Sequence, residues 1–267
     1  MTQGPTALTD AVDARLAVIA QGAPGPARLE AQLRQLAKWR SQVLANTIAA
    51  RMGDVVPAGP FAGMRYPVQA SEGGRAPRLL GAYEASLHPI LETVIARAYP
   101  QVIDIGAAEG YYAVGLARRM PGTTVHARDT DPRARALCTD LAKVNGVGPR
   151  VLVGPEVTHA DLALCAHAET FILCDIEGAE GELLDPARAP ELAQADILVE
   201  VHEGMRPGLL STLTQRFAPS HRVTRIDRAL RPDLLPDWAE GLSDLDRLLL
   251  LWEWRASPTP WLWMERL

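Results

Sequence analysis

The stretch QVIDIGAAEG at residues 101–110 joins an apolar strand, which ends in an acidic residue, to a GxxxG turn and the start of a helix. Gly106 and Gly110 carry no side chain, so the backbone can approach a ligand closely, and the N–H groups of the following helix attract a carboxylate. Open α/β sheets bind their ligands beside such turns. We therefore expect a cofactor site formed by Asp104, Gly106, Ala107, Glu109 and Gly110.

The spacing of the glycines favours S-adenosylmethionine (SAM) over a dinucleotide. A pyrophosphate-binding turn needs GxGxxG, and Ala108 stands where the second glycine of that pattern belongs. The methionyl carboxylate of SAM suits the turn, and NAD remains the alternative. The second strand ends in RDTDP at residues 128–132, where we expect Asp129 to accept hydrogen bonds from the ribose hydroxyls and Asp131 to cap the helix that starts at Pro132.

From Arg78 onward, short apolar strands alternate with helical segments. This alternation is typical of a mostly parallel sheet with helices on both faces. The predicted fold class is α/β: a Rossmann-like, seven-stranded, mostly parallel sheet whose last two strands pair as an antiparallel ribbon, preceded by an N-terminal helical extension. The strands are expected at 101–105, 123–128, 150–154, 170–174, 195–202, 221–227 and 247–254.

The first 77 residues differ in pattern from the rest of the chain. Apolar residues at helical spacing predict helices over 11–20, with Thr9 or Asp10 as the cap, and over 27–52. A loop rich in glycine and proline follows, with Phe61, Met64 and Tyr66 as apolar anchors. We expect residues 1–77 to form a helical extension and loop, and residues 78–267 the cofactor-binding domain. The helix pair could cover the active site or form a homodimer.

Composition argues against several classes of protein. The 267 residues are 48% hydrophobic and carry a net charge of −5 without a long run of like charges, which argues against a nucleic-acid partner. The three cysteines are odd in number and widely spaced, which argues against a disulfide framework and a zinc site. The sequence shows neither a membrane segment nor a leader peptide, so we expect a cytoplasmic protein with no membrane partner.

Three motifs resemble one known family. DIGAAEG at 104–110, CDIEGAE at 174–180 and LVEVH at 198–202 are similar to the FkbM-type SAM-dependent methyltransferases, over about residues 81–202. The resemblance implies a class I methyltransferase fold and O-methylation of a sugar or natural-product hydroxyl, so that the partner is a small-molecule acceptor. The stretch at 128–132 reads RDTDP, where the family usually has a Phe-Glu-Pro-like run.

The resemblance extends to the segment before the first strand. Residues 80–84, LGAYE, are similar to the segment that closes over the cofactor in related enzymes. Glu84 is implied as a contact for the amino group of SAM. A solvated glutamate on a helix is the alternative.

Catalytic candidates follow the fourth and fifth strands. Methyl transfer from a sulfonium requires alignment of the acceptor and removal of its proton. Asp175 ends the fourth strand, and period-two alternation places Glu200 and His202 on one face of the fifth. His202 is the better general base because its ordinary pKa lies near neutrality, and the three residues could instead bind a divalent ion such as Mg²⁺. Glu177 and Glu180 could be merely solvated helix charges.

Two further functions remain open besides a methyltransferase. The chain could be a SAM-binding sensor or scaffold that acts through its N-terminal helices, or a Rossmann enzyme that binds NAD. Convergence of Asp175, Glu200 and His202 favours an enzyme, because clustered polar groups cost free energy when no ligand uses them.

Overall fold

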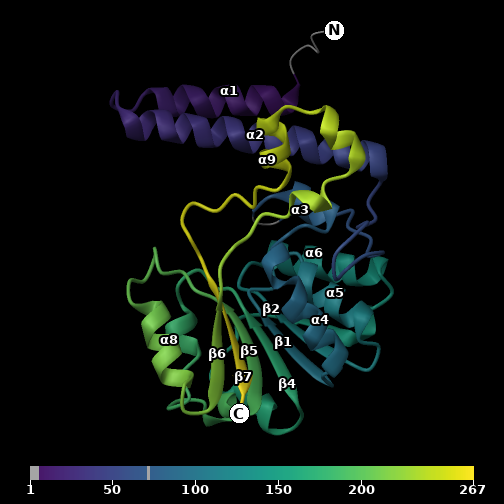
Figure 1. The fold of residues 1–267 in the computed structure, drawn as a ribbon, viewed down its shortest axis with the longest axis vertical. Helices are drawn as coiled ribbons and strands as arrows, with labels where there is room; N and C mark the ends of the chain where they lie inside the picture. Colours follow the sequence, from purple (N-terminus) through teal and green to yellow (C-terminus); the bar gives the residue numbers. More distant parts are fainter. Residues whose placement is uncertain (1–5, 71–72) are drawn as a thin grey trace.

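A seven-stranded sheet forms the centre of the computed structural model, which describes residues 6–70 and 73–267 (Figure 1). The strand order is β3-β2-β1-β4-β5-β7-β6; the first five strands run parallel, and β7 is antiparallel to both of its neighbours. This topology confirms the predicted fold class. The strands are β1 Gln101–Ile105, β2 Thr124–Arg128, β3 Val151–Gly154, β4 Thr170–Cys174, β5 Ala195–Glu200, β6 His221–Ile226 and β7 Trp261–Arg266.

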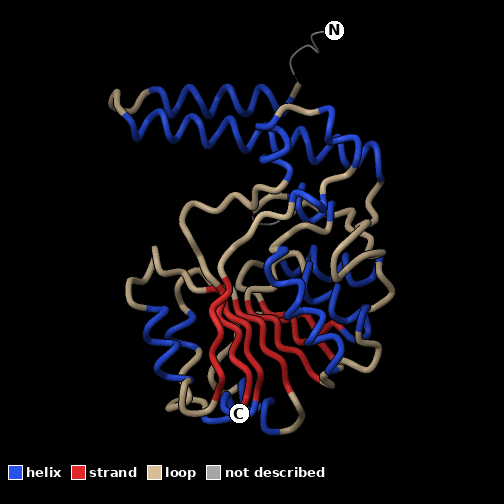
Figure 2. The backbone as a smooth tube through the Cα atoms, in the orientation of Figure 1, coloured by secondary structure: helices blue, strands red, loops and turns tan. Residues whose placement is uncertain are grey.

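Helices cover both faces of the sheet (Figure 2). Alternate residues of β1 explain why both faces are apolar: Val102 belongs to the core under α4, α5 and α6, whereas Ile103 belongs to the core under α8. The helices are α1 Ala7–Ala20, α2 Pro26–Met52, α3 Arg75–Leu80, α4 His88–Arg97, α5 Tyr111–Arg119, α6 Pro132–Val144, α7 Glu180–Leu183, α8 Leu209–Phe217 and α9 Asp244–Leu250. Among the described residues, no helix combines the length and apolar character that a membrane span requires.

The expected strand at 247–254 is wrong. Residues Asp244–Leu250 form α9 instead, whose first turn is capped by the Ser243 hydroxyl, which accepts a hydrogen bond from the Asp246 N–H. The buried leucines of this short run pack against the core from a helix, and a short apolar run is compatible with either structure. The seventh strand is Trp261–Arg266, inserted between β5 and β6, so the last two strands do form the expected antiparallel ribbon.

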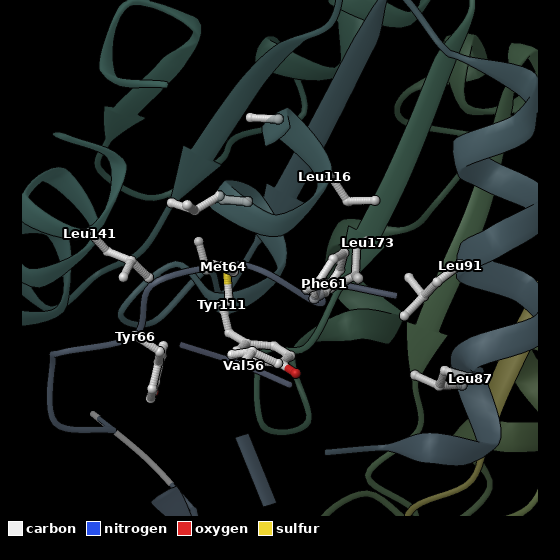
Figure 3. Packing of buried hydrophobic residues seen from close by; sticks show 14 of the residues in the cluster. Val56, Phe61, Met64, Tyr66, Leu87, Leu91, Tyr111, Leu116, Leu141 and Leu173 are labelled. Carbon is white, nitrogen blue, oxygen red and sulfur yellow. The ribbon is translucent and has the colours of Figure 1, made fainter. Parts of the chain in front are cut away.

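The N-terminal extension contributes to the core of the sheet domain. The second half of α2 and the loop after it share one apolar cluster with α5, and Phe61 contacts the Tyr111 ring edge-on with centroids 5.3 Å apart (Figure 3). An ion pair of 2.7 Å between Arg40 and Asp246 joins α2 to α9. The predicted anchors Phe61, Met64 and Tyr66 are all buried. α1 starts earlier than expected, with Thr6 as its cap.

Candidate functional site

The turn after β1 is shaped by two glycines that other residues could not replace. Gly106 and Gly110 have φ angles of +82° and +92°, in the left-handed region that favours glycine. A Cβ atom on Gly106 would lie 1.8 Å from the Asp175 carbonyl oxygen, and one on Gly110 would lie 2.6 Å from the Cys138 sulfur. The end of β1 is therefore pressed against the end of β4, at the carboxyl edge of the sheet.

Two cavities meet at this turn. One, of about 500 Å³, lies over the ends of β2 and β3 and is lined by residues that include Asp129, Thr130 and Val157. The other, of about 490 Å³, lies over the ends of β4 and β5 and is lined by residues that include His202 and Arg255. Gly106, Asp175 and Glu177 line both. An elongated ligand could therefore lie across the turn, with one end in each cavity.

The two aspartates after β2 have different roles. Asp131 caps α6, since its carboxylate accepts a hydrogen bond of 2.9 Å from the Arg133 N–H, as predicted. The Asp129 carboxylate accepts hydrogen bonds from the backbone N–H groups of Ala108, at 2.8 Å, and Asp131, at 2.7 Å. These bonds fix Asp129 on the wall of the 500 Å³ cavity. Ribose binding by Asp129 stays a prediction.

The other predicted cofactor residues divide between the cavity wall and the interior. Gly106, Ala107 and Glu109 contribute to the wall of the 490 Å³ cavity. The Asp104 side chain is fully buried and lines neither cavity, and burial raises the pKa of its carboxyl to about 8. The Glu109 carboxylate is also buried, where it accepts a hydrogen bond of 2.6 Å from the Tyr66 hydroxyl and pairs with Arg78 at 3.1 Å. The Glu109 carboxylate therefore supports the turn from inside the protein.

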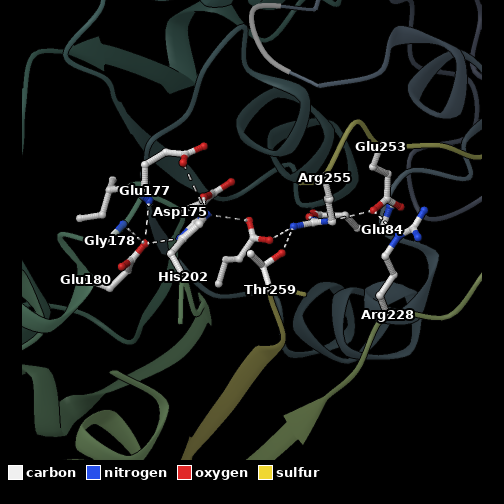
Figure 4. Close-up of polar contacts among 12 residues, drawn as sticks. Glu84, Asp175, Glu177, Gly178, Glu180, His202, Arg228, Glu253, Arg255 and Thr259 are labelled. Carbon is white, nitrogen blue, oxygen red and sulfur yellow. Dashed lines mark hydrogen bonds and ion pairs between the residues drawn. The ribbon is translucent and has the colours of Figure 1, made fainter. Parts of the chain in front are cut away.

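The three predicted catalytic residues converge at the ends of β4 and β5, and Figure 4 shows Asp175 and His202 side by side there. Asp175, Glu200 and His202 each offer one ligand atom, and these atoms all lie within 4.8 Å of one another. The Nε2 atom of His202 lies 3.6 Å from Oδ1 of Asp175 and 3.9 Å from Oε2 of Glu200. Glu177 approaches the same nitrogen at 4.0 Å, but its side chain is 57% exposed. The cluster thus directs one imidazole nitrogen at several carboxylates.

Glu180 orients the imidazole ring of His202 through a hydrogen bond to Nδ1. The alternative that Glu180 is a solvated helix charge is wrong, because its side chain is fully buried, with Oε1 2.7 Å from Nδ1 of His202. The same oxygen accepts a hydrogen bond from the Gly178 N–H at 3.1 Å. Burial raises the pKa of Glu180, but the hydrogen bonds from His202 and Gly178 outweigh it, so the pKa is lowered and the group is ionised. An ionised carboxylate only accepts, so Nδ1 carries the proton.

The protonation of the cluster is set by its acids. Burial lowers the pKa of His202, but the hydrogen bond to Glu180 and the charge of Asp175 raise it by more. Burial and the negative charge of Glu84 raise the pKa of Asp175 to about 7. The Asp175 carboxyl therefore gains and loses its proton near neutral pH, and His202 keeps its proton to a higher pH than an ordinary histidine.

Arg255 is a site residue that sequence reasoning missed. It lies in the loop between α9 and β7, and its side chain, only 17% exposed, forms ion pairs with Glu84, Glu200 and Glu253. Glu84 is buried, and its carboxylate contacts the Tyr112 hydroxyl as well as Arg255. The predicted contact of Glu84 with the amino group of SAM stays a prediction. No local pattern marked Arg255 as a site residue, because two of its partners, Glu84 and Glu200, lie on distant parts of the chain.

No family model matches the chain, and no curated protein matches it in sequence. Solved structures resemble its fold. The O-methyltransferase TomG from Streptomyces achromogenes, in complex with SAM, is 12% identical over 85% of this chain and 89% of its own, with a TM-score of 0.46. An O-methyltransferase from Bacillus cereus, in complex with SAH, is 12% identical over 97% and 99%, with a TM-score of 0.43. The human methyltransferase 10 domain containing protein is 12% identical over 85% and 96%, with a TM-score of 0.47.

Proposed function

We propose that this protein is a SAM-dependent methyltransferase that methylates a hydroxyl group of a small molecule. The observation that carries the proposal is the pair of cavities that meet at Gly106 and Asp175, with the His202 cluster in one of them. The adenosine of SAM would lie on the Asp129 side and its methionyl end over the glycine turn. The sulfonium methyl group would then face the cavity that holds His202.

The chemistry requires little from the protein beyond alignment and proton removal. When bound, SAM would supply an electrophilic methyl group to the acceptor oxygen and would leave as the neutral thioether S-adenosylhomocysteine (SAH) once its carbon–sulfur bond had broken. The acceptor proton passes to Nε2 of His202, the nitrogen left free because Nδ1 donates to Glu180. Glu180 stabilises the imidazolium that forms, because a fixed negative charge lies against it.

A divalent ion is the alternative to a direct base. The donor set of two carboxylates and one imidazole fits Mg²⁺ or Mn²⁺, and Glu180 would orient the imidazole ligand as a carboxylate partner. Asp175, Glu200 and His202 would hold the ion, which would supply Lewis-acid activation of the acceptor hydroxyl. Oε1 of Glu200 is engaged by Arg255, whereas Oε2 faces His202 and remains available to a ligand.

The finer assignment rests on the motifs at 104–110, 174–180 and 198–202. Their resemblance to FkbM-type enzymes supports a sugar or natural-product hydroxyl as the acceptor group. We also keep the proposal of a homodimer through the N-terminal helices, which the exposed Leu29 and Leu33 of α2 support.

Calorimetry with SAM, SAH and NAD, followed by a methyl-transfer assay, tests the proposed function. We expect SAM and SAH to bind and NAD to bind weakly or not at all, because the turn suits a carboxylate better than a pyrophosphate. Tight binding of NAD with no binding of SAM would refute the cofactor assignment. Binding of SAM without transfer to any acceptor would favour the sensor or scaffold.

A further inference from the structure

Helix α2 supplies two cations to the wall of the 490 Å³ cavity. Arg34 and Lys38 are one turn apart on this helix, and both line the cavity with Trp254. The Arg34 guanidinium donates to the carbonyl oxygens of Trp254 and, at 3.3 Å, Arg255, which ties α2 to the loop before β7. The Lys38 ammonium lies 4.8 Å from the centroid of the Trp254 ring. The N-terminal extension therefore forms part of the cavity itself.

Over the described residues, no acidic side chain forms an ion pair with Arg34 or Lys38 at this end of the cavity. Arg78 and Arg255, which also line the cavity, form ion pairs with acids. Arg34 donates to neutral carbonyl groups, and over residues 6–70 and 73–267 Lys38 has no hydrogen bond or ion pair with an acceptor. The opposite end of the cavity holds the acidic His202 cluster. The cavity is thus positive at the α2 end and negative at the β4 and β5 end.

The two cations at the α2 end of the cavity destabilise the protein when no ligand is bound. Like charges four residues apart on a helix repel each other, and burial together with Arg34 lowers the pKa of Lys38. A bound anion would offset both effects, because it would pair with the ammonium and screen the repulsion from Arg34. An anion would in turn be repelled from the acidic end, so it would occupy this cavity in one orientation.

We propose that Lys38, with Arg34 beside it, binds an anionic group of the acceptor. This inference rests on the proposed methyltransferase activity. The acceptor is then an anionic hydroxy compound, with a carboxylate or phosphate at the α2 end and the reacting hydroxyl at the His202 cluster. The methionyl carboxylate of SAM is the other anion that could reach this cavity, and the two sources differ in what a Lys38 variant does to SAH affinity.

The chain contains two lysines, so Lys143→Gln is a matched control for Lys38→Gln. The Lys143 side chain is 68% exposed on α6 and lies outside both cavities. Cell extract is separated by anion exchange into retained and unretained pools, and transfer of tritium from methyl-labelled SAM into each pool is measured. The KM for the active pool and the Kd for SAH are then compared between the wild type and both variants, with circular dichroism to check folding.

We expect transfer into the retained, anionic pool, a KM for that pool raised by at least about tenfold in the folded Lys38→Gln variant, and an unchanged SAH Kd. The Lys143→Gln variant should match the wild type. Transfer confined to the unretained pool, or an unchanged KM in Lys38→Gln, would overturn the inference. Loss of SAH affinity in Lys38→Gln would assign the cation to the cofactor and also overturn it. SAH binding without transfer into either pool would instead refute the proposed function.

Discussion

Glu180→Gln isolates the charge that acts on His202. Oε1 of Glu180 accepts hydrogen bonds from the backbone N–H groups of Ile176 and Gly178 and from Nδ1 of His202, whereas Oε2 is buried without a hydrogen-bond partner in the described part of the chain. A glutamine can place its carbonyl oxygen where Oε1 lies and its amide nitrogen where Oε2 lies. The substitution therefore keeps the geometry and removes the negative charge.

The size of the effect follows from the bond that loses its charge. A hydrogen bond to a charged group contributes about 1.5–3 kcal/mol, so removal of the charge should lower the pKa of His202 by about one to two units. We expect the acid limb of the turnover profile to move to lower pH, because a base with a lower pKa loses its proton earlier. The plateau should also fall, because the weaker base accepts the acceptor proton less readily.

NMR titration of the His202 ring measures its pKa directly, and the pH dependence of methyl transfer gives the second readout. Glu169→Gln is the matched control, because that side chain is 71% exposed, lies outside both cavities and pairs with Arg266 at 3.7 Å. A Glu180→Gln protein that folds normally and keeps both the wild-type His202 pKa and the wild-type acid limb would refute the role assigned to Glu180.

Three further predictions concern the cofactor, the base and the metal. Asp129→Ala should weaken SAM binding in calorimetry by at least about tenfold, because the ribose hydrogen bonds are lost. Asp131→Ala should instead lower the free energy of unfolding in urea by about 1 kcal/mol, because the cap of α6 is lost. If each variant showed the effect expected of the other, the roles of the two aspartates would be exchanged. His202→Ala should lower turnover by about 10²–10⁴-fold with SAM affinity little changed, and near-normal turnover would make His202 a structural residue. Magnesium affinity should rise with pH through about 7, because Asp175 and His202 have raised pKa values and must lose protons before they bind an ion. A flat affinity profile would contradict that site, and activity insensitive to EDTA would indicate a direct base.

The sequence predicted correctly the strands that are bounded on both sides by polar or turn residues. β1 and β4 begin and end where expected, because each is an uninterrupted buried run bounded by polar or turn residues. The seventh strand was misplaced because the leucine-rich run at 248–251 suits a helix or a strand equally well. Its helical form depends on the Ser243 cap and on packing against α2, and β7 depends on partners in β5 and β6. Pairing between distant segments cannot be read from local periodicity.

The same distinction applies to the site. Asp175, Glu200 and His202 were predictable because parallel strands bring their carboxyl ends to one edge of the sheet. Glu180 was missed because its burial depends on His202, 22 residues further along the chain. Arg255 was missed because its contact with Glu84 spans 171 residues and joins a loop to a turn, where no periodic pattern exists.

The position of β7 has a consequence for how the protein is made. Among the strands that the structure describes, β6 pairs only with β7, and β7 also pairs with β5. A ribosome synthesises β5 and β6 before β7, so both strands must wait with unpaired edges until residues 261–266 emerge from the exit tunnel. Such edges favour pairing with other chains. The nascent chain is therefore open to such pairing from the emergence of β5 until β7 has paired with β5 and β6, and chaperones that bind extended segments would protect it during this interval.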